Sequence, residues 1–244
     1  MGYTNLKPID LKKIKVVDFP QDHYFQEEFT KTQIVLHHTV ASPNSAIQVI
    51  KEWYKKPSHV ATAFVIDGDG TPYQVFSSKY WAYHLGLQQG TFDKNGVPYK
   101  PIDKTSIGVE INNWGGLIAG DDVTIKNFGT QEHPENIKLK KGYYYTAYGN
   151  ALQIPDNQIT YFPNGFRDFK YFQNYTDAQL ETVGELLLFW KNKYGIPLTY
   201  NEDMWDVSKK ALEGTSGIWT HVSFRYDKSD CFIYQPMIDM LKSL

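Results

Sequence analysis

A short apolar stretch that ends in two histidines constrains the fold of this chain more than any other feature. Residues 33–39 read Q-I-V-L-H-H-T, and the apolar run predicts a buried strand over 33–37. Because successive side chains of a strand point to opposite faces of the sheet, His37 and His38 must point in opposite directions. One of them can face a cleft, where a neutral imidazole could bind a metal ion. Taken alone, such a pair more often belongs to ordinary packing, so a metal site needs partners elsewhere in the chain.

The bulk properties narrow the classes of protein to which the chain can belong. Its 244 residues permit one large domain, and no repeat or linker indicates a second. A net charge of −2 and a pI near 6.4 give no electrostatic case for binding nucleic acid. No stretch approaches the length of a membrane span, and the N-terminus lacks the apolar core of a signal peptide. We therefore expect synthesis in the cytoplasm, without nucleic acid or membrane as a partner.

Patterns typical of strands and helices alternate along the chain. The clearest helix is predicted over 176–194, where Thr176 and Gln179 form a capping box and Gly195 follows as a stop signal. Further predicted elements are a helix from N-cap Ser42 to Pro57, a hairpin with strands at 62–66 and 72–76, a strand ending near Glu110, a short helix over 203–213 and a last helix near 236–243. This interleaving predicts an α/β fold.

Two segments lie outside that pattern. The first 30 residues are polar and charged, and we expect them to run along the surface as an N-terminal extension. Residues from about 114 to 175 are rich in glycine, tyrosine, phenylalanine and asparagine, with short alternating runs such as Y-Y-Y-T-A-Y. The aromatic content is too high for a disordered segment. We predict a long tyrosine-rich insertion that contains one or two small hairpins.

The candidate metal ligands are scattered, as they are when a site is assembled from distant strands. They are His37, His38, His59, His84, His133, His221, Asp230 and Cys231. No short H-x-x-x-H or C-x-x-C spacing marks a local zinc motif. His221 is followed nine residues later by Asp230, with Lys228 two residues before it. A loop of that size can fold back so that His221 and Asp230 meet the same ion with the lysine beside them.

Four motifs in order carry a resemblance to a known family. They are H-H-T after an apolar strand, W-A-Y-H-L-G at 81–86, S-I-G-V-E-I at 106–111, and His221 with K-S-D at 228–230. The chain resembles the zinc-dependent N-acetylmuramoyl-L-alanine amidases of type 2, which include phage lysins and peptidoglycan recognition proteins. The match runs from about 31 to 242. It implies a single catalytic domain over 31–244, with a central mixed sheet flanked by helices and interrupted by the insertion.

The resemblance also implies a centre that holds one zinc ion. His37, the first histidine of H-H-T, would be one ligand and His221 the second. In the closing pattern of the family, a lysine, any residue and then Asp or Cys supplies the third ligand, which here is Asp230. Cys231 is a rival by one position, since thiolate binds zinc strongly. The spacing from Lys228 favours Asp230.

The catalytic and substrate-binding roles follow from the same resemblance. Glu110 matches the acidic residue of the S-I-G-I-E-type strand and would act as general base. Lys228 matches the lysine that lies near the substrate carbonyl. His84 and Trp81 belong to the segment that lines the substrate groove. Some family members carry a tyrosine before the strand that here reads A-F-V-I, where this chain has A-T-A at 61–63. Glu110 can serve instead of that tyrosine.

The implied reaction is hydrolysis of the amide bond between N-acetylmuramic acid and L-alanine in peptidoglycan. Among the uses of this chemistry, a phage or prophage endolysin fits best, made in the cytoplasm and acting on the cell wall after release, as a monomer. Two alternatives stay open. One is a non-catalytic peptidoglycan-binding module, which typically lacks a zinc ligand. The other is a cytoplasmic amidase that recycles muropeptides.

Overall fold

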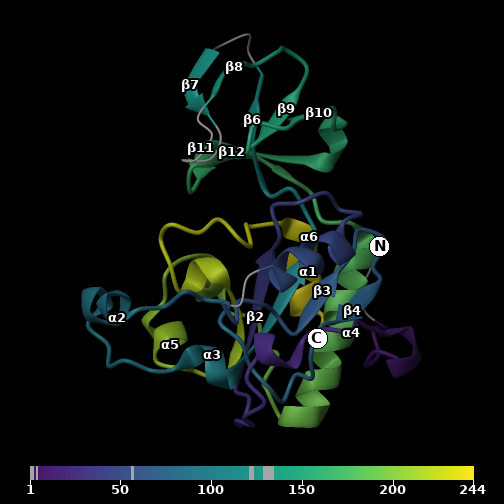
Figure 1. Cartoon of the computed structure of the whole chain (residues 1–244), viewed down its shortest axis with the longest axis vertical. Coiled ribbons are helices and arrows are strands. Elements are labelled where there is room, and N and C mark those ends of the chain that lie inside the picture. The colour runs from purple at the N-terminus through teal and green to yellow at the C-terminus, as the bar shows by residue number, and fades with distance from the viewer. Residues whose placement is uncertain (1–2, 4, 56–57, 121–123, 129–134) are drawn as a thin grey trace.

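A six-stranded mixed sheet forms the centre of the protein (Figure 1). The computed structural model describes the chain except residues 1–2, 4, 56–57, 121–123 and 129–134. In spatial order the strands are β1 (Lys15–Val16), β4 (Pro72–Gln74), β3 (Phe64–Ile66), β5 (Ser106–Ile111), β2 (Gln33–His38) and β13 (Gly217–Thr220). The pair β3–β4 is antiparallel and the other neighbours are parallel. The predicted α/β fold with a central mixed sheet is confirmed.

Helices cover this sheet. They are α1 (Ala46–Tyr54), α2 (Gln89–Asn95), α3 (Ile102–Thr105), α4 (Asp177–Tyr194), α5 (Lys209–Leu212) and α6 (Gln235–Lys242). Short 3-10 turns add Leu11–Lys13, Gln21–His23, Asp156–Gln158, Glu202–Trp205 and His221–Ser223. None of the described helices is long and apolar enough to cross a lipid bilayer.

The boundaries of α4 and α6 agree with the predictions, and the start of α1 differs. At α4, Thr176 Oγ1 accepts from Gln179 N (3.1 Å), Gln179 Oε1 accepts from Thr176 N (3.0 Å) and Gly195 adopts φ +71°, as a capping box and glycine stop require. The predicted start of the first helix at Ser42 is wrong. The Ser42 carbonyl accepts from both N and Oγ of Ser45, which closes a separate turn, so α1 begins only at Ala46.

β2 is the central strand of the part of the sheet that carries the site. It lies between β5 and β13 and runs parallel to both, with Ile34, Val35 and Leu36 fully buried. Because all three strands run in the same direction, their carboxyl ends meet at one edge of the sheet. At this edge His37 is paired in register with Glu110, and His221 follows directly after β13.

The insertion forms a second sheet beside the first (Figure 1). Its strands are β6 (Gly116–Ala119), β7 (Thr124–Phe128), β8 (Glu135–Lys138), β9 (Tyr144–Thr146), β10 (Ala151–Leu152), β11 (Ile159–Phe166) and β12 (Phe169–Gln173). Five of them make an antiparallel sheet in the order β10-β9-β6-β12-β11, and β7 pairs with β8. The predicted one or two hairpins understate this structure, because β6 pairs with strands distant in sequence.

A lysine lies buried at the start of the central strand. Lys31 is 1% exposed, and its Nζ donates to the Lys104 carbonyl oxygen at 2.7 Å. Burial lowers the pKa of Lys31 to about 7, although the Asp103 carboxylate opposes the change. An unfolded chain would titrate this group near 10.5. At pH values below 10.5 the unfolded chain keeps this proton, whereas the folded protein binds it weakly. The burial of Lys31 therefore lowers the free energy of unfolding in that pH range.

We predict that this lysine makes stability rise with pH. Between about pH 7 and pH 10.5 unfolding takes up a proton at Lys31, so the free energy of unfolding increases with pH. The rise should reach about 2 kcal/mol between pH 7 and pH 9. Urea unfolding of the Lys31→Met variant, which keeps the length of the side chain, should lack this component and show no loss of stability at pH 7. An identical pH dependence in both proteins would contradict the prediction.

Candidate metal centre

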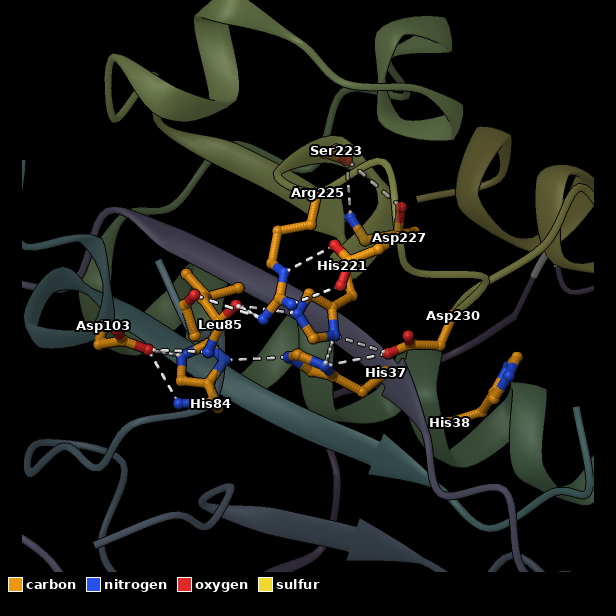
Figure 2. Close-up of polar contacts among 12 residues, drawn as sticks. His37, His38, His84, Leu85, Asp103, His221, Ser223, Arg225, Asp227 and Asp230 are labelled. Carbon is orange, nitrogen blue, oxygen red and sulfur yellow. Dashed lines mark hydrogen bonds and ion pairs between the residues drawn. The ribbon is translucent and has the colours of Figure 1, made fainter. Parts of the chain in front are cut away.

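Three side chains converge at the carboxyl edge of the central sheet (Figure 2). His37 Nδ1 lies 3.1 Å from His221 Nδ1 and 3.2 Å from Asp230 Oδ2, and His221 Nδ1 lies 3.0 Å from the same oxygen. All three residues are at most 9% exposed. Among the described residues this is the group of histidine, cysteine and acidic side chains whose atoms could hold a metal ion.

Local structure explains why these groups meet. His37 is fixed by β2, and His221 begins a 3-10 turn capped by mutual bonds between Thr220 and Ser223. The chain then loops outward and returns, and Val222 N donates to the Asp230 carbonyl oxygen at 3.0 Å. This bond holds the end of the loop beside its beginning. Asp230 is therefore held against His221, nine residues earlier in the chain.

The hydrogen bonds on the outer side of the rings assign their tautomers. His221 Nε2 lies 3.1 Å from the Leu85 carbonyl oxygen, which can only accept, so Nε2 carries the proton. Ser106 donates its hydroxyl proton to the Ile102 carbonyl oxygen, so His84 Nε2 must donate to Ser106. His84 Nδ1 is then the acceptor for Nε2–H of His37, at 2.9 Å. The Nδ1 atoms of His37 and His221 therefore carry no proton, and their lone pairs point toward Asp230.

This donor set fits a zinc ion. Two imidazole lone pairs and a carboxylate oxygen face one another with no proton between them, an arrangement that needs a cation. Tetrahedral zinc with bonds of about 2.0–2.1 Å separates its ligand atoms by about 3.3 Å. The observed separations of 3.0–3.2 Å are close to that value. Three protein ligands with nitrogen and oxygen donors are also the number found in catalytic zinc sites.

The electrostatics of His37 and Asp230 suit metal binding. Burial, together with the neighbouring His221, lowers the pKa of His37 to about 4, so its imidazole is neutral near pH 7. Burial alone would raise the pKa of Asp230, but His221 and His37 lower it well below its usual value. A neutral imidazole and an ionised carboxylate are the protonation states that metals bind.

His38 and Cys231, which follow His37 and Asp230 in the sequence, both contact Tyr175 rather than the candidate centre. His38 Nδ1 is hydrogen-bonded to Tyr175 Oη at 2.9 Å. The His38 ring lies apart from the three converging side chains (Figure 2). Cys231 is buried and hydrogen-bonded to the same Tyr175 hydroxyl. Burial raises the pKa of the Cys231 thiol well above its usual value, which keeps it protonated. The arrangement favours His37 and Asp230 over His38 and Cys231 as ligands.

Glu110 and Lys228 lie beside the candidate centre. Glu110 is paired in register with His37, so both side chains share a face of the sheet. Its Oε2 is shielded from solvent and has no hydrogen-bond partner among the residues the structure describes. Burial raises the pKa of Glu110 well above its usual value, the Asp230 carboxylate raises it further, and the Lys228 ammonium opposes the rise. Lys228 also acts on His37, whose pKa it lowers.

A family model described as N-acetylmuramoyl-L-alanine amidase matches residues 29–231. The chain belongs to this amidase family. A sequence search among curated proteins gave no match.

The chain is similar to several solved structures, each at low sequence identity. The structure of PlyL is 13% identical, with 98% of this chain and 97% of that chain covered and a TM-score of 0.47. An AmpD derivative is 13% identical, with 97% of this chain and 98% of that chain covered and a TM-score of 0.46. The endolysin LysCS, an N-acetylmuramoyl-L-alanine amidase from Clostridium intestinale, is 13% identical, with coverage of 94% and 90% and a TM-score of 0.42.

The two predicted substrate-binding residues of the amidase are both buried. His84 packs behind His37, and its side chain is 4% exposed. Trp81 is 5% exposed and stacks on Phe25 of the N-terminal segment, with ring centroids 3.9 Å apart. Their role in substrate binding stays a prediction. Of the other histidines, His59 stacks on Phe25 at 4.4 Å, and His133 lies outside the described residues.

An open groove runs beside the candidate centre, and Gly86 of the segment predicted to line a substrate groove is in its wall, whereas His84 and Trp81 are not. It has a volume of about 640 Å³ and is lined by Gly86, Gln88, Gly90, Thr91, Lys94, Asn95, Phe224, Arg225, Tyr226 and Asp227. Arg225 Nη1 donates to the carbonyl oxygens of Leu85 and Gly86, both at 3.3 Å, and its other nitrogens bond Asp227. The Leu85 carbonyl also accepts from His221, so the groove adjoins the candidate metal centre.

We predict that neighbouring residues will differ sharply in zinc binding. His37→Ala and Asp230→Ala each remove a ligand and should abolish tight binding of one zinc ion, measured by metal analysis after dialysis. The matched variants His38→Ala and Cys231→Ala should keep the ion. His38→Ala should instead lower the free energy of unfolding by about 1–3 kcal/mol, since it leaves the buried Tyr175 hydroxyl without that partner. Loss of zinc from the Cys231 variant alone would make the thiol the third ligand.

Proposed function

We propose that this amidase is zinc-dependent and hydrolyses the amide bond between N-acetylmuramic acid and L-alanine in peptidoglycan. The observation that carries the proposal is the convergence of two proton-free imidazole nitrogens and one carboxylate oxygen at a buried point. The choice of this bond rests on membership of the N-acetylmuramoyl-L-alanine amidase family. His37, His221 and Asp230 would hold the ion.

A zinc ion at this position would act as a Lewis acid and lower the pKa of a bound water to near 7. Because only three protein ligands converge, a coordination position is left for water or substrate. The protein supplies the rest of the chemistry. Its tasks are to move protons, to stabilise the negative charge that develops on the carbonyl oxygen, and to hold the substrate in the correct orientation.

Glu110 is the proposed general base. It would take a proton from the attacking water as the new C–O bond forms, and later give that proton to the nitrogen of L-alanine as the C–N bond breaks. The same carboxyl group would thus carry the proton from the water to the leaving amine. Two observations support this role: Glu110 shares a face of the sheet with His37, and its Oε2 is shielded from solvent without a partner among the described residues.

Lys228 is the proposed electrostatic partner of the developing oxyanion. Its ammonium acts on both His37 and Glu110, so its charge lies close to the centre. A fixed positive charge in a site with little water stabilises an oxyanion more strongly than it would in bulk solvent. The adjacent groove, with Lys94 and Arg225 in its wall, would receive the peptide part of the substrate.

We further propose that the biological role is that of an endolysin acting on intact cell wall, with residues 31–244 as catalytic domain, 1–30 as extension and 114–175 as insertion. The complete set of ligand atoms favours catalysis over a binding-only module. An amidase that recycles muropeptides would have the same centre but would prefer small soluble substrates. The size of the preferred substrate therefore separates the two enzymatic roles.

The reaction itself can be tested on purified sacculi. We expect the zinc-loaded protein to release free stem peptides that begin with L-alanine, identified by mass spectrometry. We expect intact sacculi to be cleaved at least as fast as soluble muropeptides of the same stem. Absence of both bound zinc and released peptides would refute the proposed activity. Cleavage of soluble muropeptides alone would support the recycling role.

The general base has its own test. Glu110→Gln keeps the shape of the side chain but cannot accept a proton, so kcat should fall by about 10²–10⁴-fold while one zinc ion is retained. Glu213→Gln, at an exposed position after α5, is the matched control and should keep full activity. Retention of wild-type kcat by the Glu110 variant would exclude Glu110 as the base.

A further inference from the structure

Two consecutive residues hold the outer nitrogens of both candidate metal histidines. The side chain of His84 accepts from His37 Nε2 at 2.9 Å, and the carbonyl oxygen of Leu85 accepts from His221 Nε2 at 3.1 Å (Figure 2). The two histidines come from different strands, β2 and the end of β13. Asp230 contacts both rings on their inner side, and the short segment 84–85 thus supports both on their outer side.

The His84 ring is itself fixed by one face of β5. Ser106 Oγ accepts from His84 Nε2 at 2.8 Å and itself donates a hydrogen bond to the Ile102 carbonyl oxygen at 2.8 Å. Two residues further along the strand, Gly108 leaves room for the ring, because a Cβ there would lie 3.0 Å from His84 Cγ. Ser106 and Gly108 share a face of β5 with Glu110, since side chains alternate along a strand. The ring can therefore neither rotate freely nor reverse its tautomer without loss of a hydrogen bond.

A single carboxylate oxygen fixes the backbone of this segment. Asp103 Oδ1 accepts from the backbone N–H of His84 at 2.9 Å and of Leu85 at 3.0 Å. The same oxygen is 3.8 Å from His84 Nε2, which donates to Ser106 instead. Asp103 belongs to α3, and its side chain is only 12% exposed. Without it, two partly buried N–H groups would lose their acceptor and the segment could shift.

We propose that Asp103 is a positioning residue of the metal centre, which acts through His84 and Leu85 to hold both histidines with their Nδ1 lone pairs turned toward Asp230. It contacts neither ligand directly. The proposal rests on the proposed zinc-dependent function for its consequence, tight metal binding. Partners that orient metal-bound histidines typically contribute 10–100-fold to metal affinity.

The first test measures zinc affinity by competition with a chelator in the full-length protein. Asp103→Ala should bind zinc about 10–100-fold more weakly than wild type. Asp103→Asn keeps an oxygen that can accept both N–H groups and should bind within a few-fold of wild type. Thr182→Ala removes a buried hydroxyl bond to the Gly70 carbonyl oxygen, far from the centre, and controls for general destabilisation. Wild-type affinity in Asp103→Ala, or equal losses in the Ala and Asn variants, would overturn the proposal.

The second test reads the tautomers directly and needs no metal. Long-range ¹H–¹⁵N NMR spectra of the metal-free protein should show His37 and His221 protonated at Nε2 in wild type and in Asp103→Asn. In Asp103→Ala and in His84→Ala, at least one of these rings should give a mixture of tautomers, and His84→Asn, whose amide oxygen replaces Nδ1 as acceptor, should restore His37. Unchanged single tautomers in both alanine variants would overturn the positioning role. Failure of wild type to bind zinc would refute the proposed function, while the NMR result would still decide the role of Asp103.

Discussion

Buried hydrogen-bond acceptors are stable when each has a donor or when a positive charge lies among them. The Nδ1 atoms of His37 and His221 and one oxygen of Asp230 satisfy neither condition from the protein alone, since the outer hydrogen bonds keep both ring protons on Nε2. The sheet tolerates this arrangement because β2 and β13 are rigid parallel neighbours that end at the same edge. The loop to Asp230, the segment 84–85 and the adjacent face of β5 all serve to keep these three atoms facing one another.

The face of β5 that looks toward the centre shows how one strand divides this work. Ser106, Gly108 and Glu110 alternate with buried apolar residues, so all three side-chain positions lie on the same face. The first accepts from His84, the second leaves space for the His84 ring, and the third lies beside the candidate metal ligands. The residue that accepts from His84, the residue that leaves it space and the proposed general base are therefore spaced two residues apart along one strand.

The features that could be predicted are those set by residues close together in the sequence, such as helix caps and the alternation of side chains along a strand. The capping box at Thr176 and Gln179 located α4, and strand alternation separated His37 from His38 once later motifs named the metal-facing partner. The five-stranded sheet of the insertion could not be predicted, because β6 pairs with β9 and β12 across many intervening residues. The contacts of His84 were also hidden. The motif marked it as important, but its partners Asp103 and Ser106 lie on elements whose position only the tertiary fold determines.

The groove and the candidate metal centre share a wall, yet the hydrogen bonds there let the groove be filled without moving the candidate ligands. Gly86 and Arg225 line the groove, and Arg225 ties the segment 85–86 to Asp227 on the loop that leads to Asp230. The Leu85 carbonyl accepts from both Arg225 and His221. A ligand that displaced Arg225 would free one of the two hydrogen bonds at this carbonyl and leave the one to His221 in place. Asp103 also holds Leu85 through its N–H, so the support of His221 does not depend on Arg225 alone.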